Sequence, residues 1–207
     1  LLLDLAFPSL GWWPLAFLSI AGGLWTLMGR SIGGAFLVGL AYGAAFYFTH
    51  LMWVVQFLGP IPWVALAGVE SLLFALGAIP IALAYRWGAL LERRATRRFL
   101  LPVLIAVLWA ARELLLGTWP YSGFPWGRIG MSQAGGPFAE AASWVGVAGL
   151  TLLIVRLCAC VVDWAARPAP RRRAELLPAA VILALLLVPA FPTTAAGSLR
   201  VGWVEGD

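Results

Sequence analysis

The residues best placed to do chemistry in this sequence are polar side chains set inside long apolar runs. They gather toward one end of the helices that these runs predict, and they are His50, Gln56, Glu70, Arg112, Glu113 and Glu140. An ionisable side chain inside a membrane span costs about 2.5 to 3.5 kcal/mol on insertion scales, so it usually faces a bundle interior or a cavity. This layer therefore indicates a cavity for an amphiphile, with polar partners for its headgroup and lipid-like walls for its tails.

A segment between two apolar runs, YSGFPWGRIGMSQ, adds four candidates to this layer: Trp126, Arg128, Ser132 and Gln133. Within it, Gly123, Phe124 and Pro125 predict a structural turn. Trp and Tyr prefer the headgroup region of a bilayer, so the simplest interpretation is an interfacial anchor loop. The alternative is that Trp126, Arg128 and Gln133 contact a lipid headgroup or a docked domain.

The other polar residues also have structural alternatives. His50 at a helix end is more often a hydrogen-bonding residue at the interface than a proton shuttle. Glu70 and Glu113 can be bonded across helices instead of contacting a headgroup. Arg112 and Glu113 are adjacent in sequence, so they do not face each other on a helix and each needs its own partner.

Composition places these residues in a membrane protein. Hydrophobic residues make up 62% of the chain, charged residues 11%, and the mean hydropathy is +0.92, whereas soluble domains are about half apolar and a quarter charged. All 14 basic residues are arginine. The net charge of the chain, +5, reflects where these arginines lie on a membrane protein and gives no sign of a nucleic-acid partner. Cys158 and Cys160 lie in an apolar run, so we expect both to act as small packing residues. We expect neither a metal nor a cofactor.

The apolar runs predict an all-α polytopic bundle over residues 1–193. A bilayer core needs about 20 apolar residues per helix. We predict seven transmembrane helices, near 1–10, 12–29, 33–57, 62–85, 99–117, 138–165 and 176–193. The sequence starts at Leu1 without a methionine, so we expect the first helix to be partial.

The arginines predict the orientation of this bundle. They fall in alternate connections, at Arg30, between Arg86 and Arg98, and between Arg167 and Arg173. Short loops rich in basic residues stay in the cytoplasm. The connections near 58–61 and 118–137, and the tail after Pro192, are then extracytoplasmic, and the polar layer lies at the outer leaflet.

The tail from 194 to 207 predicts a linker followed by one β-strand, SLRVGWVEGD, rich in β-branched and aromatic residues. An isolated strand leaves its backbone groups unpaired. We therefore expect that an extracytoplasmic domain begins here and that this chain stops at its first strand.

An ordered set of motifs resembles the apolipoprotein N-acyltransferase family. The set runs along almost the whole chain: Phe7-Pro8, Trp13-Pro14-Leu15-Ala16, the glycine-rich helix with Gly39, Gly43, Phe46 and Trp53, then Trp109, Arg112 and Glu113, Gly123-Phe124-Pro125-Trp126, Gly130, Ser132 and Gln133, Gly146 to Leu150, and Val201 to Asp207. Gly-Phe-Pro-Trp is the most specific of these. Met131 stands where the family usually has tyrosine, so a role of that ring is not carried over.

The resemblance implies the membrane domain of a bacterial inner-membrane enzyme. Such an enzyme transfers an acyl chain from a phospholipid to the N-terminal amine of a diacylated apolipoprotein, through a thioester, and needs no cofactor. In the family a Glu-Lys-Cys triad on a nitrilase-like domain does the chemistry. This chain has no lysine, and its cysteines lie within a predicted helix, so no catalytic residue is named here.

Two other classes remain open from the sequence. A transporter would place its substrate site near the midplane, often at broken helices related by repeat symmetry, and no internal repeat is evident. A non-catalytic membrane scaffold that presents a surface loop to a partner is the stronger alternative. A cavity open sideways to the outer leaflet would favour the acyltransferase.

Overall fold

The computed structural model describes residues 1–8, 10–88, 94–119, 123–166 and 176–194, together with 197 and 202. These residues form helices and turns, with no strand among them. The α-helices are α1 (Leu2–Leu5), α2 (Pro14–Leu27), α3 (Ile32–His50), α4 (Val54–Leu58), α5 (Pro60–Gly88), α6 (Arg94–Leu116), α7 (Ala142–Ala165) and α8 (Leu176–Leu186). Three short 3-10 helices lie between α6 and α7: η1 (Pro125–Gly127), η2 (Ile129–Gln133) and η3 (Ala139–Ala141).

Four of the helical segments described are long and apolar enough to cross a membrane: Ile32–His50, Pro60–Gly88, Arg98–Leu116 and Ala139–Ala165. The helical membrane bundle is thus confirmed. Helix α2 and the last helix lie where spans were predicted, but both are shorter apolar helices. The run 1–10 holds only α1, since Pro8 lacks the N–H that a continuing helix needs. Seven spans therefore stay a prediction.

Two predicted spans contain breaks. The helix expected over 33–57 ends at His50, and the chain turns through Leu51–Trp53 before α4 begins. Within α7, Gly146 has φ 68° and ψ 176°, which is not helical. That backbone region is essentially restricted to glycine. The first turn of α7 is therefore offset from its long remainder.

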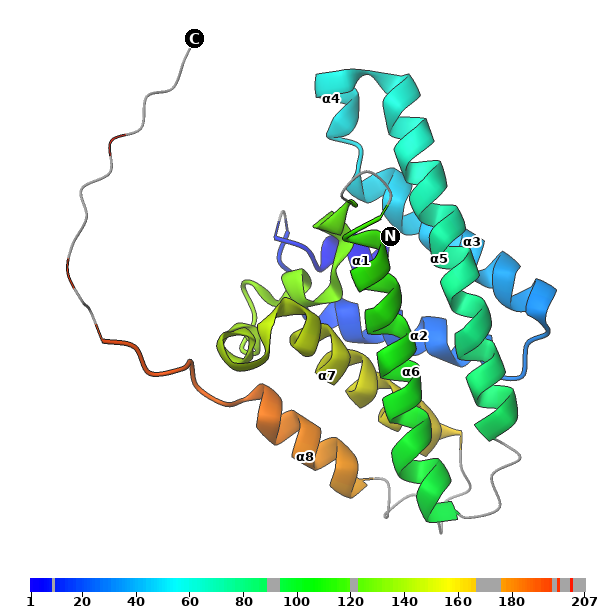
Figure 1. Cartoon of the computed structure of the whole chain (residues 1–207), viewed down its shortest axis with the longest axis vertical. Helices are drawn as coiled ribbons and strands as arrows, with labels where there is room; N and C mark the ends of the chain where they lie inside the picture. The colour runs from blue at the N-terminus through cyan, green and yellow to red at the C-terminus, as the bar shows by residue number, and fades with distance from the viewer. Residues whose placement is uncertain are drawn as a thin grey trace.

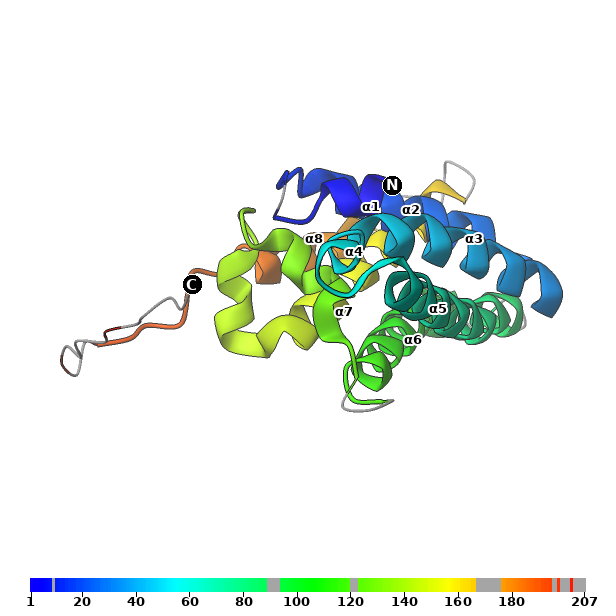
Figure 2. The same cartoon turned by 90° about the horizontal axis from the view of Figure 1, so that it is seen from above.

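The helices pack in an order that differs from their order in the sequence. Figure 1 shows α5 and α6 running upright with α3 crossing behind α5, and Figure 2 shows α1 and α2 along one edge of the bundle. The most extensive contact joins α3 to α5, followed by those of α6 with α7, α5 with α6, and α2 with α7. Helix α7 therefore connects the N-terminal helices to α6, while α8 packs on its outer side.

Small residues bring α3 and α5 close together. A Cβ added to Gly39 would lie 2.7 Å from the Cβ of Ala78, and one added to Gly43 would lie 3.1 Å from the Cα of Ser71. Membrane helices use such small residues to approach closely and gain van der Waals contact, because lipid offers no hydrophobic drive for helices to associate. The glycine spacing of four residues on α3 thus sets this crossing.

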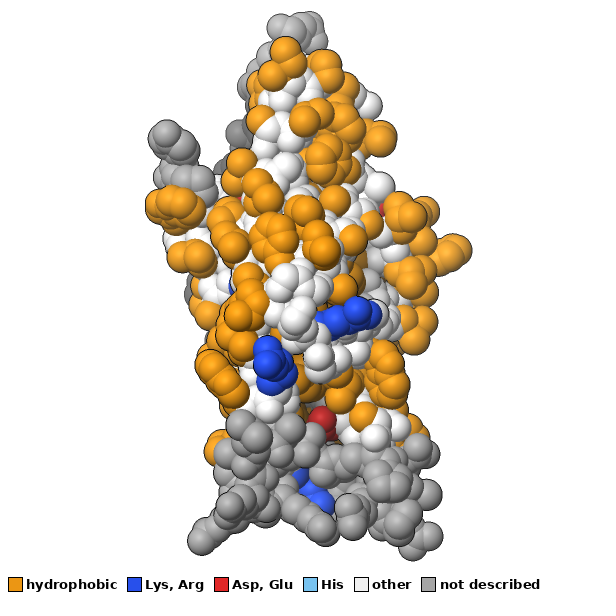
Figure 3. Space-filling model, turned by 90° about the vertical axis from the view of Figure 1, so that its right-hand side faces the viewer, with side chains coloured by type: hydrophobic (Ala, Val, Ile, Leu, Met, Phe, Trp, Pro, Cys, Tyr) orange, Lys and Arg blue, Asp and Glu red, His pale blue; other side chains and the backbone are white. Residues whose placement is uncertain are grey.

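Large apolar side chains cover the outside of the bundle. Phe57, Ile61 and Leu37 are 76%, 82% and 65% exposed, and Figure 3 shows a face that is mostly hydrophobic, with basic side chains only in its lower half. Contiguous apolar surface on this scale marks a protein–membrane boundary. The face is suited to lipid.

The chain after α8 is tied back to the start of α7. Ala190 N donates to Glu140 Oε2 at 3.0 Å, Phe191 N donates to Ser143 Oγ at 2.7 Å, and Trp144 Nε1 donates to Pro189 O at 2.8 Å. The rings of Trp144 and Phe191 also meet edge to face, 4.7 Å between centroids. We call this set the α7–tail clasp. The predicted linker and strand over 194–207 lie outside the described residues, apart from 194, 197 and 202.

Candidate functional site

Glu113 is the centre of a buried hydrogen-bond network, which we call the Glu113 hub. The side chain lies near the end of α6 and is 6% exposed. Its Oε1 accepts from Trp109 Nε1 at 3.0 Å and from Ile129 N at 3.2 Å, and its Oε2 accepts from Thr151 Oγ1 at 2.9 Å. Thr151 in turn accepts from Gly130 N at 2.9 Å. One carboxylate thus joins α6, η2 and α7. Of the two roles considered for Glu113, the structure shows hydrogen bonding across helices.

Arg112 packs against two aromatic rings, and one of them, Trp109, also belongs to the hub. Its guanidinium carbon lies 3.7 Å from the centroid of the Phe74 ring and 4.3 Å from that of Trp109. A cation over an aromatic face is stabilised by the ring quadrupole, most strongly where water is excluded. The side chain is 7% exposed, and Nε and Nη1 have no hydrogen-bond partner among the described residues.

Glu70 lies on α5 near Arg112. It is 3% exposed, its carboxyl group is hydrogen-bonded to the Tyr47 side chain, and Arg112 lies close enough to interact with it electrostatically. Within the described part of the chain its Oε2 has no hydrogen-bond partner. The structure therefore brings Glu70 on α5 and Arg112 and Glu113 on α6 into one buried region.

The turn predicted at Gly123 to Trp126 folds back on the end of α6. Gly123 has φ 74°, and Phe124 N donates to Leu116 O at 2.7 Å. Pro125 opens η1, and its fixed φ suits the first position of a helical turn. Trp126 is 55% exposed and its ring lies 5.5 Å from that of Trp53. This places an aromatic side chain on the surface, with the turn anchored below it.

Arg128 follows the turn and is half-buried. Together with Tyr47 and Glu113 it lines a small pocket under η1. Its Nε is buried and has no hydrogen-bond partner among the residues described. The Arg128 side chain thus lies at the base of the exposed turn.

Ser132 and Gln133 face inward instead. They are 2% and 0% exposed. Gln133 Nε2 donates to Ser132 Oγ at 2.9 Å, and Ser132 Oγ donates to Ile129 O at 2.7 Å. The Gln133 Oε1 is buried without a hydrogen-bond partner among the described residues. Both side chains brace η2 from inside.

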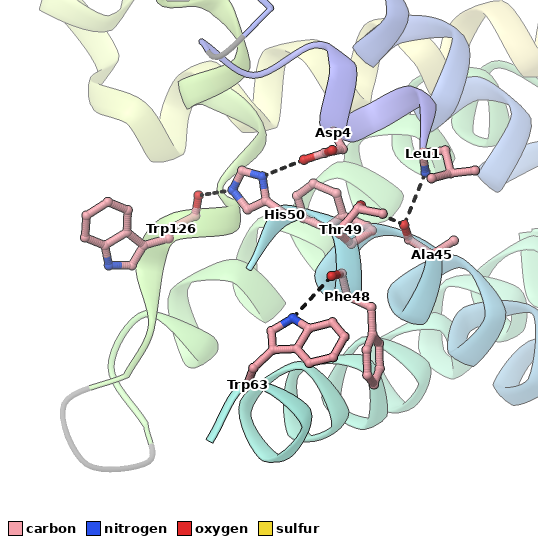
Figure 4. Close-up of polar contacts among 9 residues, drawn as sticks. Leu1, Asp4, Ala45, Phe48, Thr49, His50, Trp63 and Trp126 are labelled. Atoms are coloured by element: carbon pink, nitrogen blue, oxygen red, sulfur yellow. Dashed lines mark hydrogen bonds and ion pairs between the residues drawn. The ribbon is translucent and has the colours of Figure 1, made fainter. Parts of the chain in front are cut away.

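His50 connects three separate parts of the fold at the end of α3. Its Nδ1 lies 3.0 Å from Asp4 Oδ1 and its Nε2 lies 3.2 Å from Trp126 O. Figure 4 shows the ring between these two oxygens, with the Trp126 indole pointing away from it. The imidazole stacks on Phe46, 4.8 Å between centroids. His50 therefore ties α1 and η1 to α3.

Two predicted members lie apart from this group. Gln56 is exposed on α4. Glu140 is also exposed and belongs to the α7–tail clasp. The described residues contain no group of three His, Cys, Asp or Glu side chains that could hold a metal ion.

Sequence reasoning missed two residues of this site. Thr151 is 0% exposed and carries one arm of the hub, but a threonine within an apolar helix usually bonds its own backbone. Asp4 lies in the first apolar run and pairs with His50, 46 positions away. A lone carboxylate inside an apolar run was the signal that could have identified Asp4.

An apolar groove lies beside the α7–tail clasp, between the start of α7 and the end of α8. Trp144, Val145 and Leu185 are 52%, 46% and 47% exposed, so the groove is open to the surface of the molecule. Its lining is made by Ala141, Trp144, Val145, Leu153, Leu185 and Val188. Such walls suit a hydrocarbon chain.

Comparisons with known proteins agree with one another. The family model described as "Apolipoprotein N-acyltransferase N-terminal domain" matches residues 1–160. A protein named apolipoprotein N-acyltransferase from Geobacter metallireducens is 34% identical over an alignment of 215 residues, covering 99% of this chain and 39% of the relative. The protein of that name from Haemophilus ducreyi is 32% identical over 187 residues, covering 88% and 35%. One from Mycolicibacterium smegmatis is 40% identical over 92 residues, covering 42% and 16%. The chain spans less than half the length of these relatives.

Proposed function

Because the chain belongs to the apolipoprotein N-acyltransferase family, we propose that it forms the membrane domain of an enzyme that moves an acyl chain from a phospholipid to an apolipoprotein. The acceptor is the free N-terminal amine of a diacylglyceryl-modified cysteine. The observation that carries the proposal is the match of the family model to residues 1–160. The enzyme lies in the bacterial cytoplasmic membrane, with the η1 turn and the tail on its outer side.

The proposed chemistry has two half-reactions. A thiolate on a nitrilase-like domain attacks an ester carbonyl of the phospholipid, which forms a thioester and releases a lysophospholipid. The acceptor amine then attacks the thioester, which forms an amide and returns the thiol. The Glu-Lys-Cys triad for these steps belongs to the domain expected after residue 194. The bundle holds that domain at the membrane and admits two-tailed substrates from the side.

The geometry supports a lipid-handling role in two ways. The Glu113 hub fixes η2 from below, so the exposed Trp126 and the half-buried Arg128 are presented from a braced support. The groove beside α7 supplies an apolar wall that is open to the surface of the molecule. We propose Trp126 and Arg128 as contacts for a lipid headgroup or for the docked catalytic domain. Gln133 and Ser132, being buried, act by holding η2 in place.

The two rival classes are less well supported. A scaffold needs neither the apolar groove nor the braced polar turn. A transporter is expected to interrupt its helices near the midplane, whereas the break at Gly146 lies in the first turns of α7.

The proposal is tested with the complete protein in proteoliposomes, by following transfer of a labelled acyl chain to a diacylated lipopeptide. Replacing Arg128 by alanine removes the cation under η1. We expect the rate to fall at least tenfold with the thermal unfolding temperature unchanged, since a charge-assisted contact contributes about 1.5 to 3 kcal/mol. The matched control is Arg86→Ala, because Arg86 is an exposed arginine at the last turn of α5.

The two variants separate the outcomes. Wild-type rates for Arg128→Ala would refute the role of this arginine. Equal losses in both variants would point to a general effect of membrane charge. Absence of any transfer by the unmodified complete protein would refute the enzyme and favour the scaffold.

A further inference from the structure

Both ring nitrogens of His50 face hydrogen-bond acceptors. Nδ1 lies 3.0 Å from a carboxylate oxygen of Asp4, and Nε2 lies 3.2 Å from the carbonyl oxygen of Trp126. A neutral imidazole carries one N–H and one lone pair, whereas the imidazolium carries two N–H donors. A neutral ring beside an ionised Asp4 can therefore satisfy only one of these two oxygens, and the protonated ring satisfies both.

Two aromatic rings and one carboxylate lie against the imidazole. The imidazole stacks on Phe46 at 4.8 Å and meets Phe7 at 4.4 Å between centroids. A cation near an aromatic face is stabilised by the ring quadrupole. The His50 and Asp4 side chains are 15% and 28% exposed, so water screens their attraction only in part. A hydrogen bond with an ionised partner is also about twice as strong as a neutral one.

Other charged groups on the neighbouring elements are directed elsewhere. Arg128, two residues after Trp126, lines the pocket with Tyr47. Glu113 on α6 has both oxygens engaged in the hub. The amino group of Leu1 donates to Ala45 O. Asp4 is thus the charged partner of the ring among the described residues, with an N···O distance of 3.0 Å.

We propose that His50 is a proton-dependent clamp, which in its doubly protonated form holds the η1 turn to α1 and to the end of α3. When the ring loses one proton, Asp4 keeps Nδ1–H and the lone pair of Nε2 faces the Trp126 carbonyl. The contact between η1 and α3 is then lost. Histidine side chains exchange this proton roughly between pH 5 and 8, so the grip on the turn responds to external pH. The inference concerns hydrogen bonds and does not depend on the proposed reaction.

The test reads the ring and the carbonyl together in the complete protein in nanodiscs. Histidine labelled with 15N in its ring reports protonation, and His50 is assigned by comparison with His50→Gln. If tryptophan carries 13C at its carbonyl and glycine carries 15N at its amide, only a tryptophan followed directly by a glycine gives a carbonyl–nitrogen correlation signal. Two such pairs occur in this sequence, Trp126–Gly127 and Trp87–Gly88. The second pair is an internal control, since Trp87 lies at the end of α5.

We expect both ring nitrogens to be protonated at pH 5.5. As pH rises, the Trp126 carbonyl signal moves upfield with the same midpoint as the ring signal, and the Trp87 signal stays in place. In Asp4→Asn, the amide N–H can donate to Nδ1 of a neutral ring while Nε2–H still reaches Trp126. The Trp126 signal should then be independent of pH.

Two results would overturn the clamp. One is a ring that carries a single proton at pH 5.5. The other is a ring that titrates while the Trp126 carbonyl signal stays fixed. Both results are read from spectra of the unmodified protein, and His50→Gln serves only to assign the ring signal.

Discussion

At the scale of single residues, one carboxylate accounts for how the η1–η2 segment meets the bundle. Glu113 offers two oxygens to three donors that come from α6, η2 and α7. The sequence placed Glu113 in the polar layer because it lies in an apolar run. It did not reveal the donors, since Ile129 and Thr151 lie 16 and 38 positions away. Hydrogen-bond partners this distant follow from packing, which hydropathy does not contain.

Replacing Glu113 by glutamine tests the hub. The amide keeps one acceptor oxygen but turns an N–H₂ group toward a donor, so at least one buried donor loses its partner. We expect a loss of about 1 to 3 kcal/mol in the free energy of unfolding, measured as a lower thermal midpoint in detergent. The matched control is Glu140→Gln, because Glu140 is exposed and its amide oxygen can still accept from Ala190 N. A control that loses as much as the hub variant would contradict this account.

His50 shows the other limit of residue-level prediction. The sequence indicated an interfacial hydrogen-bonding histidine, and both of its ring nitrogens are within reach of oxygens. Asp4 was missed because it stands alone in the first run, 46 positions from His50. A single acidic residue gives no spacing from which a partner can be inferred.

At the scale of elements, hydropathy located the helices better than it located their ends. The runs near 62–85 and 99–117 correspond to α5 and α6, because about 20 consecutive apolar residues suffice to predict a span. The breaks after His50 and at Gly146 lie within equally apolar sequence, so hydropathy did not register them. The strand predicted in the tail lies outside the described residues and stays a prediction.

The crossing of α3 on α5 gives a prediction at this scale. An alanine at 39 would place its Cβ 2.7 Å from the Cβ of Ala78 and 2.8 Å from the Cα of Ala75. The backbone of α5 would have to move to relieve this clash. We therefore expect Gly39→Ala to lower the free energy of unfolding by about 1 to 3 kcal/mol through overpacking. The measurement is the thermal midpoint in detergent.

Gly68→Ala is the matched control, since a Cβ added to Gly68 on α5 meets nothing within 4 Å. There the higher helix propensity of alanine should leave stability unchanged or raise it by up to about 1 kcal/mol. Similar behaviour of the two variants would mean that the α3–α5 contact is looser than the structure indicates.

At the scale of the whole molecule, the alternation of arginines predicts which side of the membrane each end of the bundle faces. On the face drawn in Figure 3 the basic side chains lie in the lower half, and the orientation itself stays a prediction. The η1 turn lies near the start of α4, since the ring of Trp126 is 5.5 Å from that of Trp53.

Cysteine labelling in intact cells tests this orientation. Gln56→Cys, exposed on α4, should react with a membrane-impermeant maleimide added from outside. Arg86→Cys, exposed at the end of α5, should react only after the membrane is made permeable. Cys158 and Cys160 are buried and add no background, and the unmodified protein sets the baseline. The reverse pattern would invert the topology and remove the outer-leaflet site.

The α7–tail clasp also has a mechanical consequence. Helix α8 has 11 residues, and a pull on the chain beyond Phe191 would otherwise peel it open from its last turn. The clasp prevents this, because the backbone of Pro189, Ala190 and Phe191 is hydrogen-bonded to side chains 45 to 50 positions earlier in the chain. The force is then transmitted to the start of α7, so the tail can move without unfolding α8.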